Sequence, residues 1–132
     1  MSKAEETLAL MLDVEDIAYE REYRFAAEHV GIGAGIRQRL KDAGMKDWLA
    51  DFRIIGVPLL VEVEGITHYG RNRNGTMKLG RHQTGAGIEG DLLKYEAAMR
   101  IGYTVYRCSQ HMVKSGRAIE SIEILKRRLM HT

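Results

Sequence analysis

The 132-residue sequence contains one cysteine, Cys108, and no run of roughly 18 consecutive apolar residues. One cysteine excludes an internal disulfide and any zinc site built from several cysteines. The lack of a long apolar run excludes a membrane-spanning helix, and the opening residues MSKAEETLAL lack the pattern of a signal peptide. We therefore expect a cytoplasmic protein.

Acidic residues are missing between Gly65 and Ile88, although the whole chain is nearly balanced at a net charge of +2. This segment is rich in glycine, so we expect a long loop over about 65–87. A local basic charge favours a polyanionic partner, and contacts to several phosphates would weaken steeply with salt. A solvated surface loop is the alternative. The basic side chains of the segment are Arg71, Arg73, Lys78 and Arg81, with His68 and His82.

The remaining composition, 45% apolar and 29% charged residues, is typical of one globular domain over residues 1–132. The patterns predict the order helix, strand, inserted helix, strand, strand, helix, strand, helix. The insert covers about 30–47, and its GIGAG stretch at 31–35 is expected to be a flexible break. In the helix predicted at 88–102, one face carries Ile88, Leu92, Tyr95 and Met99. We expect strands at 19–25, 48–54, 59–65 and 103–109, and further helices near the N-terminus, at 36–44 and at 115–130.

Two glutamates interrupt the apolar stretch PLLVEVEG at 58–65. Side chains alternate along a strand, so Glu62 and Glu64 share one face and the apolar residues between them point to the other. Asp51 lies on the preceding strand, and a hairpin would bring it beside Glu62. Neighbouring like charges raise each other's free energy unless a cation lies between them, and three converging carboxylates suit Mg²⁺ or Mn²⁺. The alternative is an edge strand with solvated glutamates.

Six stretches of the sequence, in their order and spacing, match a known family. They are AEETL (4–8), EREYRF (20–25), WLADF (48–52), LLVEVEG (59–65), GRHQTGAGIEGDLLKYEAA (80–98) and GYTVYR (102–107). Their order resembles the PD-(D/E)xK nuclease superfamily, and more closely the small phage and prophage endonuclease-like proteins related to very-short-patch-repair endonucleases. The resemblance implies an α/β, restriction-endonuclease-like core, in which a mixed sheet follows the order helix-strand-strand-strand-helix-strand and carries flanking helices. It also implies a Mg²⁺-dependent endonuclease acting on DNA, in the host cytoplasm if the gene belongs to a phage.

Carried onto this sequence, the first acid of the family corresponds to Asp51 and the second to Glu62. The family's usual lysine, two residues later, is replaced by Glu64. Three readings remain open: Lys94 on the following helix replaces that lysine, as a basic residue does in similar relatives; Glu64 itself binds the metal or orients water; or catalysis has been lost. A simpler role for Lys94 is a helical ion pair with Asp91, three residues earlier.

Other polar residues have both a functional and an ordinary interpretation. Glu5 aligns with an acid that many relatives carry on the first helix, and it equally completes a capping box at the start of that helix. His68 or His82 could act as general acid or base or bind a phosphate, with His68 nearer the acidic strand, and either could be a plain surface residue. Glu89 and Asp91 could join the site, or they could balance the helix dipole.

The carboxylates and the resemblance together predict a metal-dependent DNA endonuclease, and the resemblance implies a function in phage or prophage DNA repair, recombination or branched-DNA processing. A catalytically silent DNA-binding module that keeps the fold is the alternative, and a metal-dependent RNA nuclease is a further one. One active site makes one cut, so cutting both strands or a junction would require a homodimer.

Overall fold

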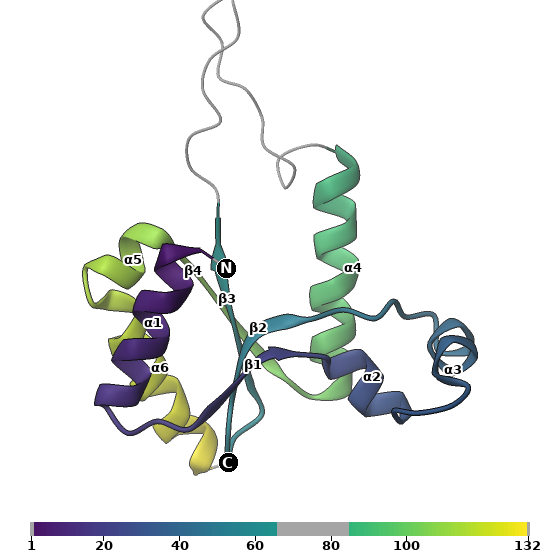
Figure 1. The fold of residues 1–132 in the computed structure, drawn as a ribbon, viewed down its shortest axis with the longest axis horizontal. Coiled ribbons are helices and arrows are strands. Elements are labelled where there is room, and N and C mark those ends of the chain that lie inside the picture. Colours follow the sequence, from purple (N-terminus) through teal and green to yellow (C-terminus); the bar gives the residue numbers. More distant parts are fainter. Residues whose placement is uncertain (1, 66–84, 132) are drawn as a thin grey trace, which may run out of the picture.

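The computed structural model describes residues 2–65 and 85–131, and its centre is one four-stranded sheet (Figure 1). β1 pairs with β2 and β2 with β3 in antiparallel fashion, whereas β3 and β4 run parallel. This arrangement confirms the predicted α/β class, with a mixed open sheet and flanking helices. The strands, in their spatial order, are β1 (Tyr19–Tyr23), β2 (Ala50–Ile54), β3 (Leu59–Glu64) and β4 (Thr104–Ser109).

One face of the sheet is covered by α1 (Lys3–Val14), α5 (Gln110–Lys114) and α6 (Arg117–Met130) (Figure 1). Alternate side chains of β2 and β3 point into this layer, which forms the larger core cluster: Phe52, Ile54, Leu59, Val61 and Val63. The cluster confirms the predicted alternation along β3. The predicted capping box also forms at the start of α1, where the Ser2 hydroxyl accepts from the Glu5 N–H at 3.1 Å.

The opposite face carries α4 (Gly85–Ile101) and the insert helices α2 (Phe25–Val30) and α3 (Ile36–Asp42). A smaller core cluster forms there around Phe25, Leu60 and Ala98. Strand β3 therefore lies between two neighbouring strands and between two helical layers, and its residues are buried from Leu59 to Val63. The alternative of an edge strand with solvated glutamates is wrong, because β4 pairs along the full length of β3.

Several boundaries differ from the prediction. β1 ends at Tyr23, because Phe25 begins the unpredicted α2, and β2 begins at Ala50. Trp48 precedes β2 and stacks on Phe25, with ring centroids 6.4 Å apart. α4 begins at Gly85, inside the range expected to be loop, and α5 was not predicted. None of the described helices combines the length and the apolar character that a membrane crossing needs.

Of the four residues predicted to share one face of α4, Tyr95 turns toward the sheet and the other three do not. Ile88, Leu92 and Met99 are exposed, with Leu92 at 57%, whereas Ala98 is buried at 1%. The prediction was wrong because the sheet surface beneath α4 carries carboxylates, so the helix turns a mixed face with Lys94 toward it. The spacing of apolar residues shows which of them share one side of a helix, but it does not show which side packs against the sheet.

The GIGAG segment, expected to be a flexible break, is held by one side chain. Arg39 of α3 donates hydrogen bonds to the carbonyl oxygens of Val30 at 3.1 Å, Gly31 at 3.2 Å and Ala34 at 2.7 Å. Three of the segment's residues have positive φ angles, between 82° and 119°, which glycine adopts without strain. These residues are Gly31, Gly33 and Gly35.

Candidate active site

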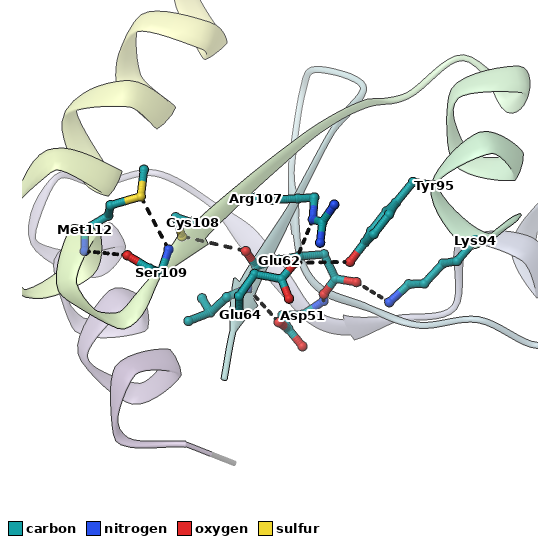
Figure 2. Close-up of polar contacts among 10 residues, drawn as sticks. Asp51, Glu62, Glu64, Lys94, Tyr95, Arg107, Cys108, Ser109 and Met112 are labelled. Carbon is teal, nitrogen blue, oxygen red and sulfur yellow. Dashed lines mark hydrogen bonds and ion pairs between the residues drawn. The ribbon is translucent and has the colours of Figure 1, made fainter. Parts of the chain in front are cut away.

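The carboxylates of Asp51 and Glu62 lie side by side on β2 and β3, one step beyond the paired residues Phe52 and Val61. The backbone N–H of Asp51 donates to Glu62 Oε2 at 3.1 Å, and the N–H of Val63 donates to Asp51 Oδ2 at 2.8 Å. Each carboxylate is thus bound to the backbone of the other strand (Figure 2). The hairpin brings together the two acids that the sequence analysis paired.

This proximity has a clear electrostatic consequence for Asp51. Burial, followed by the negative charge of Glu62, raises the pKa of Asp51 to about 8. The hydrogen bond from the Val63 N–H acts in the opposite direction, and the charge of Glu5 adds a smaller upward contribution. Glu5 is therefore close enough for its charge to act on Asp51, although its carboxylate also completes the capping box. The site holds more negative charge than it can stabilise unaided.

Lys94 places a cationic group at this pair of carboxylates. It extends from α4 toward the sheet and forms an ion pair with Glu62 Oε1 (Figure 2). Both side chains are largely buried, with 18% of Lys94 and 7% of Glu62 exposed. The structure therefore places the candidate replacement for the missing lysine against the second acid, across from α4 on β3.

Glu64 is held by two residues that the sequence analysis did not assign to the site. Its Oε1 accepts from Arg107 Nε at 2.6 Å and from the Tyr95 hydroxyl at 3.4 Å. The Arg107 guanidinium lies 4.3 Å from the centre of the Tyr95 ring. Burial and the charges of Glu62 and Glu64 raise the pKa of Tyr95, which keeps its hydroxyl protonated as a donor.

Two signals could have identified these residues. The alternation of β4 places Arg107 on one face of that strand, and its pairing with Glu62 in the parallel ladder makes that face the acidic one. Tyr95 follows Lys94 directly, but it was grouped with the apolar side chains of α4. The missing information was the register between β3 and β4 for Arg107, and the rotation of α4 for Tyr95.

An open cleft of about 160 Å³ lies over these groups. Asp91 lines it, whereas Glu89 is exposed and does not. A wider cleft of about 380 Å³ lies between α4 and residues 43–48, but Glu96 is its only acid, so the smaller cleft is the better candidate for metal and phosphate chemistry. The residues that line the smaller cleft are Asp51, Glu62, Val63, Glu64, Gly65, Asp91, Lys94 and Tyr95.

The fit to a divalent ion is partial. Among residues 2–65 and 85–131, no three His, Cys, Asp or Glu side chains are already arranged to hold a metal. The Asp51–Glu62 pair nevertheless supplies hard oxygen donors, and its mutual repulsion is the kind that a bound dication relieves. Glu64 would have to turn an oxygen away from Arg107 or reach the ion with its other oxygen. A metal bound by all three acids stays a prediction.

The predicted phosphate contacts lie outside the described residues. They come from the basic segment that follows Glu64. They are His68, Arg71, Arg73, Lys78, Arg81 and His82.

No protein-family model matches the chain, and comparisons with curated proteins and with solved structures find no match.

Proposed function

We propose that the protein is a Mg²⁺- or Mn²⁺-dependent DNA endonuclease with a restriction-endonuclease-like core of the PD-(D/E)xK kind, and that it acts in phage or prophage DNA repair, recombination or branched-DNA processing. One observation carries the proposal: Asp51 and Glu62 share a cleft in which burial and repulsion raise the pKa of Asp51, and a lysine from the next helix reaches the same pair. An acid whose pKa is raised inside a cleft favours an active site.

The order of elements supports the proposal. The helix, three antiparallel strands, helix and parallel strand follow the order that the resemblance implies, with Asp51 and Glu62 on the second and third strands. The insert of α2 and α3 interrupts this order between β1 and β2 and lies away from the acidic cleft.

Each residue of the site has a role within this proposal. A dication bound by Asp51 and Glu62 would lower the pKa of a coordinated water and offset charge on the phosphate. Lys94, paired with Glu62, would orient the attacking water as a donor and stabilise the hydroxide that forms. Glu64 would complete or support the metal site. Glu5 would add negative charge near Asp51.

The basic segment after Glu64 would supply phosphate contacts through Arg71, Arg73, Lys78 and Arg81, with His82 beside them. His68 would lie nearest to the chemistry as a general acid or base. Cutting both strands or a junction would use a homodimer with two such sites.

Relaxation of supercoiled plasmid tests this function. We expect the wild-type protein to nick DNA with Mg²⁺ or Mn²⁺ and to stop when EDTA is added. Asp51→Asn keeps the size of the side chain and an acceptor for the Val63 N–H, yet nicking should fall to background. Asp42→Asn, an exposed change on α3, is the matched control and should cut normally.

A catalytically silent DNA-binding module is the second candidate. It is favoured by the replacement of the family's lysine with Glu64 and by the engagement of that carboxylate with Arg107. Binding of duplex or branched DNA without nicking under either metal would support the module. Repeating the cleavage assay on RNA would expose an RNA nuclease.

A further inference from the structure

Arg107 lies next to Glu64 and Tyr95, which line the acidic cleft, and only part of its guanidinium makes contacts there. It lies on β4, the edge strand, and pairs in the parallel ladder with Glu62. Its Nε donates to Glu64, and the flat group packs over the Tyr95 ring at 4.3 Å. These two contacts set the direction of the guanidinium plane (Figure 2).

The outer edge of this guanidinium is available to a ligand. Within the described part of the chain, neither Nη1 nor Nη2 makes a hydrogen bond, and 46% of the side chain is exposed. Arginine presents its two terminal nitrogens as a rigid fork that matches the oxygens of a phosphate. A fork held by stacking and by one carboxylate loses less rotational freedom on binding than a free surface arginine.

The charges around Arg107 indicate when such a contact forms. Among the described residues that line the cleft, the acids outnumber the cations: Glu64 is paired with Arg107 and Glu62 with Lys94, and Asp51 lies beside Glu62. Net attraction for a polyanion is therefore weak at this spot until a dication offsets the carboxylate charge. Arg107 therefore orients a bound phosphate through hydrogen bonds, and adds little to the net charge of the cleft.

We propose that the free edge of Arg107 binds a non-bridging phosphate oxygen of the DNA strand that lies over the acidic cleft. This inference rests on the proposed function, since it assumes that DNA enters the cleft. In this proposal Arg107 contacts the substrate directly. The contact with Glu64 by itself would make Arg107 only a positioning residue for that acid.

Three variants separate these roles. Arg107→Met removes the charge and the fork, and Arg107→Lys keeps a charge for Glu64 but loses the fork. Arg53→Met is the matched control, because Arg53 also stacks on a tyrosine, at 5.0 Å, and pairs with a glutamate, at 2.7 Å, but lines a different cleft near Val57.

The measurement is binding of a fluorescent DNA duplex, by anisotropy, at several KCl concentrations, with Ca²⁺ as the divalent ion. We expect Arg107→Met to weaken binding about tenfold and to reduce the slope of log affinity against log salt by about 1. Arg107→Lys should keep the slope and still bind more weakly than wild type, while Arg53→Met should match wild type. Calorimetric titration with Mn²⁺, without DNA, should show no loss of affinity in either Arg107 variant, because Arg107 shares an oxygen of Glu64 rather than helping it to bind metal.

The inference is overturned if both Arg107 variants keep wild-type DNA affinity and salt slope. It is also overturned if they lose Mn²⁺ affinity with the salt slope unchanged, because Arg107 would then act only through Glu64. Arg107→Lys retains a cation for Glu64, so its Tm should match that of wild type. An unchanged Tm shows that weaker DNA binding by this variant does not come from misfolding. Wild-type behaviour separates the two proposals: no DNA binding by wild type removes both, whereas normal wild-type nicking with unaffected variants removes only the role of Arg107.

Discussion

Replacing Asp51 with asparagine should stabilise the folded protein at neutral and alkaline pH. Burial and the charge of Glu62 raise the pKa of Asp51 to about 8, whereas an aspartate in an unfolded chain ionises near ~3.9. Between these two values the folded state holds a proton that the unfolded state has released. Stability is therefore present below the unfolded pKa and is lost as pH rises through the folded pKa. The asparagine side chain would not titrate, and its amide oxygen can still accept the Val63 N–H.

The size of the effect follows from the linkage between proton binding and folding. A difference of one proton changes the free energy of unfolding by about 1.4 kcal/mol per pH unit, so the upper limit from pH 4 to pH 8 is roughly 5.5 kcal/mol. Asp51 is only half-buried, and solvent screening reduces this limit considerably. We expect Asp51→Asn to be about 2 kcal/mol more stable than wild type at pH 8 and equal to it at pH 4. At this chain length, about 2 kcal/mol corresponds to roughly 7 °C in Tm.

Urea unfolding from pH 4 to pH 9 measures the difference directly. Wild type, Asp51→Asn and the exposed control Asp42→Asn would be compared in metal-free buffer, and then again with Mn²⁺. The control should follow wild type at every pH. Equal or lower stability of Asp51→Asn at pH 8 would refute the reasoning, because the two carboxylates would then not repel each other in the folded state. Mn²⁺ should stabilise wild type more than Asp51→Asn.

Three further outcomes are expected. Lys94→Met should lower the free energy of unfolding by about 3 kcal/mol, because Glu62 stays buried without its cation. Adding Glu62→Gln to this variant should restore most of the lost stability, and additive losses in urea unfolding would contradict the pairing. Arg39→Met should lower the free energy of unfolding by about 2 kcal/mol and make residues 31–35 accessible to protease, because it removes the hydrogen bonds to three carbonyl oxygens. An unchanged digestion pattern would show that Arg39 does not hold this segment. Glu5→Gln keeps an acceptor for the capping box, so Tm should hold while nicking falls, and equal nicking would confine Glu5 to the cap.

The predicted order of elements was largely correct because its signals are local. Alternation over 59–64 and the capping box at the N-terminus depend on residues a few positions apart, and both appear as expected. The pairing of Asp51 with Glu62 was also within reach, since a short hairpin leaves few possible registers. Lys94 was reached through the resemblance, and the structure brings it to Glu62.

The misplaced face of α4 shows where this local information ends. The spacing of Leu92 and Met99 is helical, yet both are exposed, while Lys94 and Tyr95 turn toward the sheet. The rotation of a helix depends on the surface beneath it, and here that surface includes two acids from other segments. Arg107 escaped notice for the same reason, because its neighbours come from β3 and α4.

The sequence by itself determined which residues alternate along β3, where the first helix is capped and which two acids face each other across a hairpin. The tertiary structure decided which cations pair with the two acids of β3: Lys94 with Glu62, and Arg107 with Glu64, which also accepts from the Tyr95 hydroxyl. The physical reason is distance along the chain. A repeat follows from the geometry of one backbone segment, whereas the register of β4 and the rotation of α4 depend on packing between segments more than thirty residues apart.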